Sequence, residues 1–333
     1  MSALWQVRGV QAADLSTLAG WLPAADLETL DMLESSSDDQ LLVAERVQPD
    51  GEGSEPLGCI RLRRHIGREV PRYWYHLGRV VHAAPDLGLY RLERRLLLGN
   101  DHTGAAELSD LVISPSFVDG EDGTHAALQH LLLSAALLLL QRDDAQLIAS
   151  ERCAKVIVAL PGLRDPSGNA PFWEGFGRHF YSGSVEQAQA RFGSLWLTYV
   201  AALLPRHPLV VSLLHADAQA AIGLIDQQAH SQRDALEALG LRAGQHISVH
   251  DGGPVYEASF EQLRHSQAWR LLAVHIGEVD LSAKRCVIAQ AHGQNVWQLP
   301  ASVNAEGALC ISAASARRMG IGQSADAVVW VGI

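Results

Sequence analysis

The sequence LSDLVI at residues 108–113, followed by SPSFVDGEDG at 114–123 and THAALQHLLLSAALLLLQ at 124–141, decides the fold. The first part is mostly apolar and predicts a buried strand, and the Gly- and Asp-rich second part predicts a loop. The third part predicts an apolar helix, with Thr124 as its N-cap and Gly123 allowing a tight turn before it. Free backbone N–H groups at the start of such a helix point at the loop, so this order predicts an anion-binding site.

Further strands and helices flank this segment in a mixed order that predicts an α+β fold. A turn-rich stretch, Pro49–Pro56, predicts a hairpin connection between two of the upstream strands. The upstream strands are predicted at Trp5–Val10, Leu41–Val47, Leu57–Leu62 and Tyr73–Ala83, with a helix from about Ala12. Downstream, strands are predicted at Lys155–Leu160 and Gln245–Val249, and helices near Pro171, at Ala218–Leu224 with Asp217 as N-cap, and at Gln232–Leu239 stopped by Gly240.

The pattern of apolar and polar residues changes beyond about Trp269. Short apolar stretches alternate there with polar turns, which predicts a small β-rich module. They are Leu271–His275, Arg285–Ala289, Val296–Leu299, Leu309–Ile311 and Ala327–Val331. We therefore expect a main domain over residues 1–268 and a C-terminal module over residues 269–333.

Composition narrows the class of protein. With 333 residues, 48% of them hydrophobic, the chain can bury a sizeable core, and its net charge of −11 disfavours nucleic-acid binding. The four cysteines have no CxxC spacing, so neither a zinc site nor a disulfide framework is predicted. No secretion signal is recognised at the N-terminus, and the apolar run Leu131–Leu140 is shorter than the ~20 residues that span a bilayer. We expect a cytoplasmic protein without a membrane segment.

Several motifs together resemble the arginine N-succinyltransferase family. The blocks keep the family's order over roughly residues 70–265, although the front of the chain looks shortened. They are Tyr73–Gly78 with Val81–Ala83, Gly99–Gly104 with Glu107 and Leu108, Pro171–Trp173 with Gly177–Phe180, Leu204–Pro208, and Asp251–Pro254.

The resemblance implies a GNAT-like acyl-CoA N-acyltransferase fold with an extra C-terminal β module. It implies transfer of succinyl from succinyl-CoA, a co-substrate rather than a permanently bound cofactor, to the α-amino group of L-arginine in arginine catabolism. Some relatives are paired, non-identical subunits that also take ornithine, so the resemblance implies a homodimer or a hetero-oligomer with a family member. No metal is implied.

The reaction requires a base, because an amine attacks a thioester only when it is neutral. The family's proposed acid/base is a histidine in a Gly-x-x-His segment. Here that segment is Gly223–Asp226, so Asp226 stands at the catalytic position. His230 lies four residues further on, one helical turn away, and is the alternative catalytic residue; a solvent-facing histidine is its plainer interpretation.

The acyl-CoA site is predicted from Leu111, which matches a family leucine on the central strand, and from Gly123 and Thr124 at the start of the helix. The family's basic loop position holds Val118, and three carboxylates occupy the loop Asp119–Asp122. Unit charges ~4 Å apart repel by about 1 kcal/mol in water, so these carboxylates oppose phosphate binding unless the loop points away from the ligand. Binding of a divalent cation by this loop is a further, weaker interpretation.

The substrate site is predicted in the loop before the central strand. Asn100, Asp101 and His102 are placed to face a substrate, and Asp101 suits a guanidinium group. The presence of Asn100 and Asp101 is explained equally well by a local turn, because Asn and Asp are favoured in turns. Glu107 is either a substrate ligand or a strand residue paired with another side chain.

Several polar positions of the family are replaced here. Ala159 and Pro161 stand where the family commonly has a glutamate and an arginine, and Ala202 replaces another glutamate. Two interpretations therefore stay open: an active acyl-CoA N-acyltransferase, or a catalytically degenerate paralogue that acts as a partner subunit or an arginine-sensing protein. A different acyltransferase, with another acyl-CoA or amine, is the third.

Overall fold

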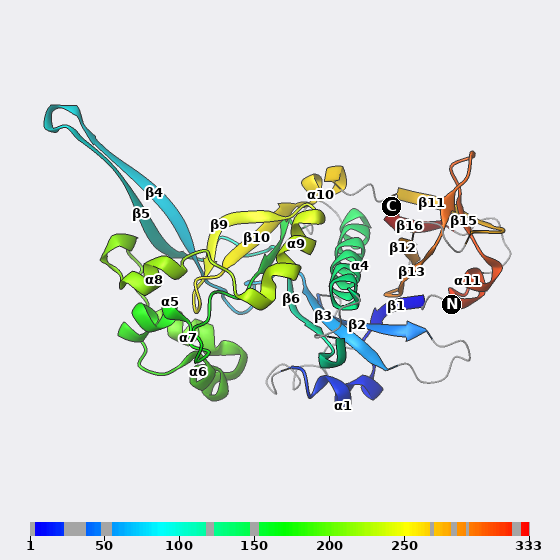
Figure 1. Cartoon of the computed structure of the whole chain (residues 1–333), viewed down its shortest axis with the longest axis horizontal. Helices are drawn as coiled ribbons and strands as arrows, with labels where there is room; N and C mark the ends of the chain where they lie inside the picture. The colour runs from blue at the N-terminus through cyan, green and yellow to red at the C-terminus, as the bar shows by residue number, and fades with distance from the viewer. Residues whose placement is uncertain are drawn as a thin grey trace.

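The computed structural model describes residues 4–22, 38–47, 55–117, 123–146, 153–266, 270–280, 285–290, 293–321 and 328–332. Within these residues, helices and strands alternate in an elongated molecule (Figure 1). The strands are hydrogen-bonded in the order β14-β15-β11-β16-β12-β13-β1-β2-β3-β6-β7-β10-β9-β4-β5-β8. The predicted α+β class is confirmed.

The central part of the sheet is antiparallel except at one place. Its strands are β1 (Leu4–Gly9), β2 (Asp39–Val47), β3 (Pro56–Arg63), β6 (Ala106–Ile113), β7 (Lys155–Ala159), β10 (Pro254–Ser259) and β9 (Arg242–Ser248). Only β6 and β7 run parallel to each other. Helix α1 (Leu15–Leu18), preceded by the 3-10 turn η1 (Ala12–Asp14), contributes Leu18 to a small apolar cluster with Leu41, Val43 and Cys59.

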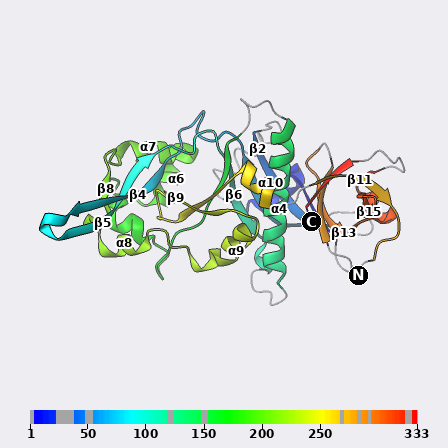
Figure 2. The ribbon, with the colours of Figure 1, turned by 90° about the horizontal axis from the view of Figure 1, so that it is seen from above.

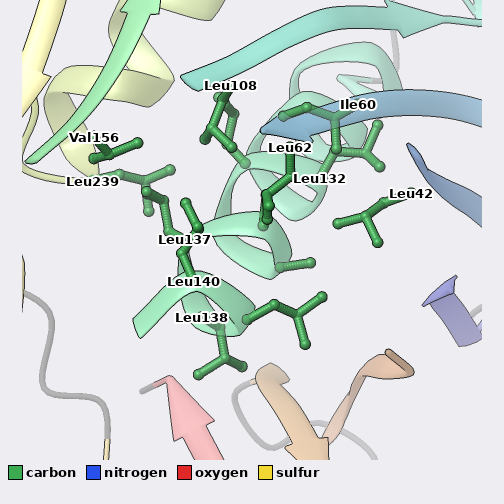
Figure 3. Packing of buried hydrophobic residues seen from close by; sticks show 14 of the residues in the cluster. Leu42, Ile60, Leu62, Leu108, Leu132, Leu137, Leu138, Leu140, Val156 and Leu239 are labelled. Carbon is green, nitrogen blue, oxygen red and sulfur yellow. The ribbon is translucent and has the colours of Figure 1, made fainter. Parts of the chain in front are cut away.

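Helix α4 (Thr124–Gln146) forms the core of the molecule against one face of this sheet. Figure 3 shows Leu132, Leu137 and Leu138 among the strand residues Ile60 and Leu108. Helix α9 (His230–Ala238) packs alongside it, and Ser231 Oγ donates a 2.8 Å hydrogen bond to Gln129 Oε1 of α4. By length and composition α4 could cross a membrane, but most of it is buried inside the protein, as in the core helix of a folded domain. The apolar segment is thus longer than the sequence run suggested.

A helical region lies between β7 and β9 in the sequence. It comprises α5 (Pro171–Gly175), α6 (Val185–Phe192), α7 (Trp196–Leu203), β8 (Leu209–Val210) and α8 (Ala216–Ala221), with the 3-10 turns η5 (Gly177–His179), η6 (Gly193–Leu195), η7 (Val211–Leu213) and η8 (Gln227–Ala229). The region has a hydrophobic core of its own, which includes Phe172 and Phe176 together with Tyr75 of the neighbouring strand. Arg178 forms an exposed ion pair with Glu174 at 2.9 Å.

A long hairpin of β4 (Trp74–Ala84) and β5 (Leu89–Gly99) extends away from the body of the molecule (Figures 1 and 2). A 3-10 turn, η2 (Pro85–Leu87), and Gly88 with φ +60° close its tip. The sequence predicted β4 but not β5. In β5 the run Leu89–Arg95 mixes apolar and arginine residues without a clear period, and pairing with β4 along its whole length makes it a strand.

The C-terminal part holds β11 (Arg270–Ile276), β12 (Arg285–Gln290), β13 (Val296–Pro300), β14 (Ser302–Val303), β15 (Leu309–Ile311), α11 (Ala313–Arg318) and β16 (Val328–Gly332). These elements enclose a separate apolar cluster that includes Ile288, Leu299 and Val331. Strand β13 also pairs with β1, so the sheet continues from one part into the other. The division at residue 268 stays a prediction. Helix α10 (Phe260–Ser266) precedes this part.

Most predicted elements are confirmed within a few residues, including the antiparallel pairing of β2 and β3; their predicted hairpin loop lies largely outside the described residues. Two predicted caps are wrong. Thr124 is already the first helical residue, because Gly123 O accepts the first intrahelical bond from Ala127 N at 3.1 Å. His215, rather than Asp217, caps α8, which ends at Ala221 ahead of the left-handed Gly223.

Candidate active site

The parallel strands β6 and β7 separate after a short contact. Only Ala106 with Val156 and Glu107 with Ile157 are paired between them. Beyond these pairs β6 continues to Ile113 and β7 to Ala159 without pairing to each other. The edge of β6 that faces the opening therefore has backbone N–H and C=O groups with no ladder partner in β7.

A β-bulge in β6 lies at this opening. Opposite β3, the register shifts so that Asp110 and Leu111 together face Ile60. Asp110 takes φ +51°, a left-handed conformation that is uncommon for residues other than glycine, and a bulge of this kind bends the strand. Leu111 is half-buried against the core around α4, so the predicted acyl-CoA residue lies at the point where β6 bends.

The start of α4 lies past the C-terminal end of β6, after the 3-10 turn η3 (Pro115–Phe117). Gly123 is exposed with φ +72°, and open space surrounds the position of a Cβ. Thr124 is half-buried. The first-turn N–H groups of this long helix form a positive end. The acidic residues of the predicted phosphate loop, 118–122, lie outside the described residues.

Asp226 lies beside the C-terminal end of β7. Its backbone N donates to Pro161 O at 2.9 Å, and its neighbour Ile225 forms an isolated β-bridge with Gly162. The half-buried carboxylate accepts a 2.9 Å hydrogen bond from Gln228 N and so caps η8. His230 is exposed at the first position of α9. The structure thus brings Asp226 to the β7 side of the opening, with His230 one turn further along.

Asp251 braces the segment that holds Asp226 in place. Its buried carboxylate accepts 2.9 Å hydrogen bonds from Gly162 N and Gly253 N. Burial alone would raise the pKa of Asp251, but the charge of His250 and these N–H donors hold that pKa below its ordinary value. A Cβ on Gly162 would lie 2.3 Å from Asp251 O, so the two backbones pack directly together. The motif Asp251–Pro254 signalled the family, but its bracing role was not predicted.

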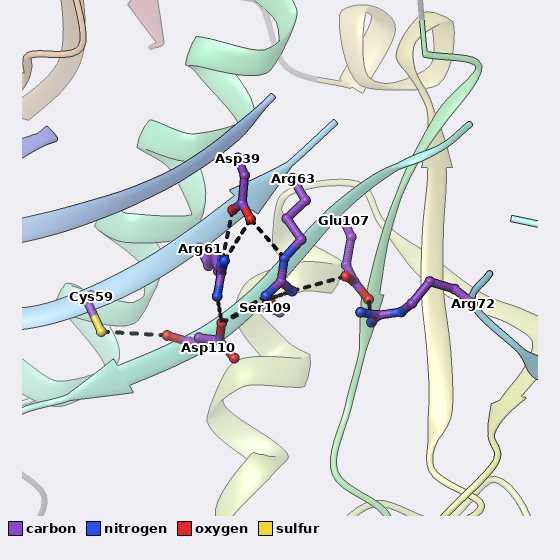
Figure 4. Close-up of polar contacts among 8 residues, drawn as sticks. All are labelled: Asp39, Cys59, Arg61, Arg63, Arg72, Glu107, Ser109 and Asp110. Carbon is purple, nitrogen blue, oxygen red and sulfur yellow. Dashed lines mark hydrogen bonds and ion pairs between the residues drawn. The ribbon is translucent and has the colours of Figure 1, made fainter. Parts of the chain in front are cut away.

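The sheet face opposite α4 carries a network of ion pairs, shown in Figure 4. Ile60, Leu62 and Leu108 point into the core around α4, so Arg61, Arg63 and Glu107 point to the other face. Arg61 donates to both oxygens of Asp39, at 2.7 and 2.6 Å.

Glu107 belongs to this network. It is buried, and its carboxylate accepts from Arg72 Nη2 at 2.6 Å and from Arg63 Nη1 at 3.4 Å. Glu107 is therefore a paired strand residue in this structure, and its role as a substrate ligand stays a prediction. Any substrate group that binds Glu107 must share it with, or displace, a guanidinium group of the chain.

A second polar cluster lies at the N-terminal end of β7. His102 is fully buried, with Nδ1 3.9 Å from Glu257 Oε2, and its ring centroid lies 4.1 Å from that of His246. His246 Nε2 lies 3.1 Å from Asp101 Oδ2. Lys155 Nζ donates to Glu257 Oε2 at 2.7 Å. Asn100 is exposed and its carbonyl accepts from the backbone and hydroxyl of Thr103, which is local turn chemistry.

Burial and the nearby positive charges of His246 and Lys155 lower the pKa of His102 to about 4. The ring is therefore neutral at pH 7, and within the described part of the chain neither ring nitrogen has a hydrogen-bond partner. Ligand atoms of His102, His246 and Glu257 lie within 4.8 Å of one another, a spacing that a metal ion could use. Because the Lys155 ammonium group already neutralises Glu257, the negative charge of the cluster is balanced without a metal ion.

Comparison with known proteins places the chain among acyltransferases. The family model described as "Arginine N-succinyltransferase beta subunit" matches residues 28–265. The chain belongs to the arginine N-succinyltransferase family. The arginine N-succinyltransferase of Salmonella arizonae is 30% identical over 266 residues, which cover 80% of this chain and 73% of that protein. The arginine N-succinyltransferase of Yersinia enterocolitica is 32% identical over 235 residues, covering 71% of this chain and 65% of that protein.

The fold agrees with a solved structure of the family. Subunit AI of arginine/ornithine succinyltransferase from Pseudomonas aeruginosa superposes with a TM-score of 0.77 at 22% identity. The match covers 99% of this chain and 98% of that one, so the C-terminal strands are included. The predicted GNAT-like fold with additional C-terminal strands is confirmed.

The structure of this arginine N-succinyltransferase family member places the predicted site residues in two separate groups. Leu111 and Asp226 flank the opening, on its β6 side and its β7 side, and Gly123 and Thr124 start the helix that follows β6. Asp101 and His102 lie instead with Lys155 and Glu257, at the other end of β7. Glu257 is paired with Ile157, whereas Asp226 is bonded to Pro161, so at ~3.3 Å per residue roughly 13 Å of chain separates the two groups.

Proposed function

We propose that this chain transfers succinyl from succinyl-CoA to the α-amino group of L-arginine. The observation that carries the proposal is the opening between β6 and β7, with a bulged strand on one side and a helix N-terminus past its end. This arrangement suits an acyl-CoA, which needs an extended groove for its pantetheine arm and N–H donors for its pyrophosphate. The names of its relatives support succinyl as the acyl group and arginine as the acceptor.

In this proposal the pantetheine arm lies along the free edge of β6, past Leu111. The pyrophosphate lies at Gly123 and Thr124, where first-turn N–H groups attract an anion by about 0.3–1 kcal/mol per charge. Gly123 serves this role because its left-handed backbone, φ +72°, leaves open space where a side chain would stand. The thioester then lies near the point where β6 and β7 separate.

The transfer step forms one C–N bond and breaks one C–S bond. The neutral α-amine attacks the thioester carbonyl, and the tetrahedral intermediate expels the CoA thiolate. The amine nitrogen loses one proton and the thiolate gains one, so a single group can accept the first and donate the second. We assign this role to Asp226, which lies beside the opening; His230, one turn away, is the alternative.

A second function is favoured by the ion pairs of Glu107. Arg72 and Arg63 already satisfy this carboxylate, and Ala159 and Pro161 offer no charge at the end of β7. A partner subunit without catalysis of its own fits these substitutions. Ornithine is the other acceptor to be compared, because the name of the matched Pseudomonas aeruginosa protein includes both arginine and ornithine.

We place the protein in the cytoplasm, with acyl-CoA and an amino acid as its small-molecule partners and without nucleic acid or membrane as a partner. Within the described residues all four cysteines are free, which suits a reducing compartment. Assembly as a homodimer or with a family member is part of the same proposal.

The test is product analysis by mass spectrometry. The purified chain is incubated with succinyl-CoA or acetyl-CoA, each with L-arginine or L-ornithine. N-succinylarginine formed with succinyl-CoA supports the proposal, and preference for another pair reassigns the substrates. If no product forms while a family member with known activity produces it under the same conditions, the partner-subunit function replaces the proposed one.

A further inference from the structure

Three segments that are far apart in the sequence meet at the N-terminal end of β7. The loop after β5 contributes Asp101 and His102, strand β9 contributes His246, and strand β10 contributes Glu257. One ligand atom from each of His102, His246 and Glu257 lies within 4.8 Å of the other two. The fold therefore brings two imidazole rings and a carboxylate to one point.

The His102 ring has hydrogen-bonding capacity that the described residues do not use. Its side chain is fully buried, and in that part of the chain neither ring nitrogen has a hydrogen-bond partner. A buried polar group that lacks a partner lowers stability, so such a group calls for a ligand or another explanation. Burial also keeps the ring neutral at pH 7, which is the form that binds a metal ion.

His246 is oriented by a carboxylate, as histidines that bind metals commonly are. Its Nε2 lies 3.1 Å from Asp101 Oδ2, and this hydrogen bond lowers the pKa of Asp101, which is therefore ionised at neutral pH. An ionised carboxylate only accepts hydrogen bonds, so in the neutral ring Nε2 carries the proton and Nδ1 carries the lone pair. Nδ1 is buried and has no hydrogen-bond partner among the described residues. The Asp101–His246 pair thus matches the carboxylate–histidine arrangement that supports a metal ligand.

We propose that His102, His246 and Glu257 bind a zinc ion. Two imidazole nitrogens and one carboxylate oxygen are a donor set that zinc uses, with a water molecule as the fourth ligand. With bonds of about 2.1 Å, the ligand atoms of a tetrahedral site lie roughly 3.4 Å apart. His102 Nδ1 and Glu257 Oε2 are already 3.9 Å apart. Side-chain movements of about 1–1.5 Å bring the other pairs to the spacing of a tetrahedral site.

The Lys155 ammonium group competes with the ion for Glu257. It donates to Glu257 Oε2 at 2.7 Å and so balances this carboxylate when no ion is bound. The side chains of Lys155 and Glu257 are 28% and 29% exposed, so the lysine can turn towards solvent and leave a route to the buried His102. After this exchange Glu257 keeps a positive partner, and nitrogens of both histidines gain one.

The ion would join the loop after β5 to strands β9 and β10. We therefore expect zinc to stabilise the folded chain, because a ligand that binds only the folded state raises its stability. The proposal does not rest on the transfer chemistry, since Asp226 lies beside the opposite end of β7. A chain without transfer activity can still bind zinc here, and an active chain can fail to bind it.

The experiment is a calorimetric titration of the full chain, without a histidine tag, after removal of metals with a chelator. We expect one zinc ion per chain, with a dissociation constant in the micromolar range or lower. The variants His246→Phe and Glu257→Gln should each raise this constant at least tenfold, because each keeps the shape of the side chain but removes a ligand. Lys155→Met should lower it at least threefold, because the competing ammonium group is gone.

His76→Gln is the matched control for these variants. The His76 ring lies 5.2 Å from that of His246, but His76 is outside the proposed set of ligands. This control should leave the dissociation constant unchanged, and circular dichroism shows whether each variant is folded. Two readouts need no variant: zinc should raise the melting temperature of the wild-type chain, and cobalt(II) in place of zinc should give the visible absorption of a tetrahedral site.

Absence of saturable zinc binding by the wild-type chain overturns the proposal. Zinc binding that folded His246→Phe and Glu257→Gln leave unchanged, or that His76→Gln weakens equally, places the ion elsewhere and also overturns it. Lys155→Met that binds zinc no more tightly than wild type contradicts the exchange at Glu257. A cobalt spectrum typical of six oxygen ligands contradicts the proposed histidine ligands.

Discussion

Arg72 Nη2 lies 2.6 Å from Glu107 Oε1, so a residue that resembled a substrate ligand in the sequence is held by the chain's own guanidinium group. Arg63 approaches the other oxygen at 3.4 Å. A buried carboxylate with two arginine partners contributes to stability mainly because removing it takes a counter-charge away from partly buried guanidinium groups. Arginine binding and structural pairing at Glu107 therefore predict different results on mutation.

We predict that Glu107→Gln lowers the free energy of unfolding by about 1–3 kcal/mol, measured by urea denaturation. The neutral amide keeps the shape of the side chain but removes the counter-charge of Arg72 and one of the carboxylates around Arg63, which keeps Asp39 at 3.4 Å. Glu174→Gln is the control, since Glu174 forms an exposed pair with Arg178 and its loss should cost at most about 0.5 kcal/mol. Unchanged stability, together with a raised KM for arginine, would show that Glu107 is a substrate ligand instead.

Gly123→Ala tests the helix N-terminus as the pyrophosphate site. At φ +72° an alanine costs about 1–2 kcal/mol of strain, so the loop must rearrange and the first-turn N–H groups shift. We expect the KM for succinyl-CoA to rise about tenfold, which corresponds to ~1.4 kcal/mol.

The control for this substitution is Gly168→Ala. Gly168 also has a positive φ, +84°, and open space around its Cβ position, but it lies in the loop before α5. It should lose a similar amount of stability with no change in KM. Equal KM values for wild type and Gly123→Ala would remove the helix N-terminus from the proposed site.

We predict that the protein loses stability in acid because of His102. Its pKa is about 4 in the folded chain, against about 6.5 when unfolded, so between these values the unfolded state binds the proton more readily. Stability is therefore full above pH 6.5 and decreases as the pH falls towards 4. At pH 4.5 this group should cost about 2 kcal/mol relative to pH 7.

The measurement is urea denaturation of wild type and His102→Gln at pH 7 and pH 4.5. Other groups titrate in both proteins, so the difference between the two pH dependences isolates the histidine. The variant should lose about 2 kcal/mol less than wild type over this range. Identical losses would mean that His102 is not held neutral in the folded chain.

The main elements of the fold were predictable because their signals are local. The apolar strand, the loop and the long helix of residues 108–141 have a clear order, and the structure places them as β6, η3 and α4. Strand β5 was not predicted, because its residues become a strand only through pairing with β4. The cap at Thr124 was misplaced by one residue, because Gly123 already supplies the first helical acceptor.

The candidate site was predictable only in part. Asp226 and Leu111 were predicted from their places in family motifs; Leu111 lies on β6 and Asp226 beside the end of β7, and their roles stay predictions. The grouping of Asp101 and His102 with Glu257 and Lys155 depends on strands far apart in the sequence, so no local pattern could predict it. The bracing role of Asp251 likewise depends on a contact across 89 residues.

The most direct test of the proposed function measures release of free CoA thiol from succinyl-CoA, with and without L-arginine. Wild type, Asp226→Asn and His230→Ala are compared after each is shown to be folded by circular dichroism. We predict arginine-dependent release by wild type, at least a tenfold lower kcat for Asp226→Asn, and a change below threefold for the exposed His230→Ala. Release that does not depend on arginine, or no release beside an active family member, would contradict the proposed transfer. Equal kcat for wild type and Asp226→Asn would contradict the role assigned to Asp226.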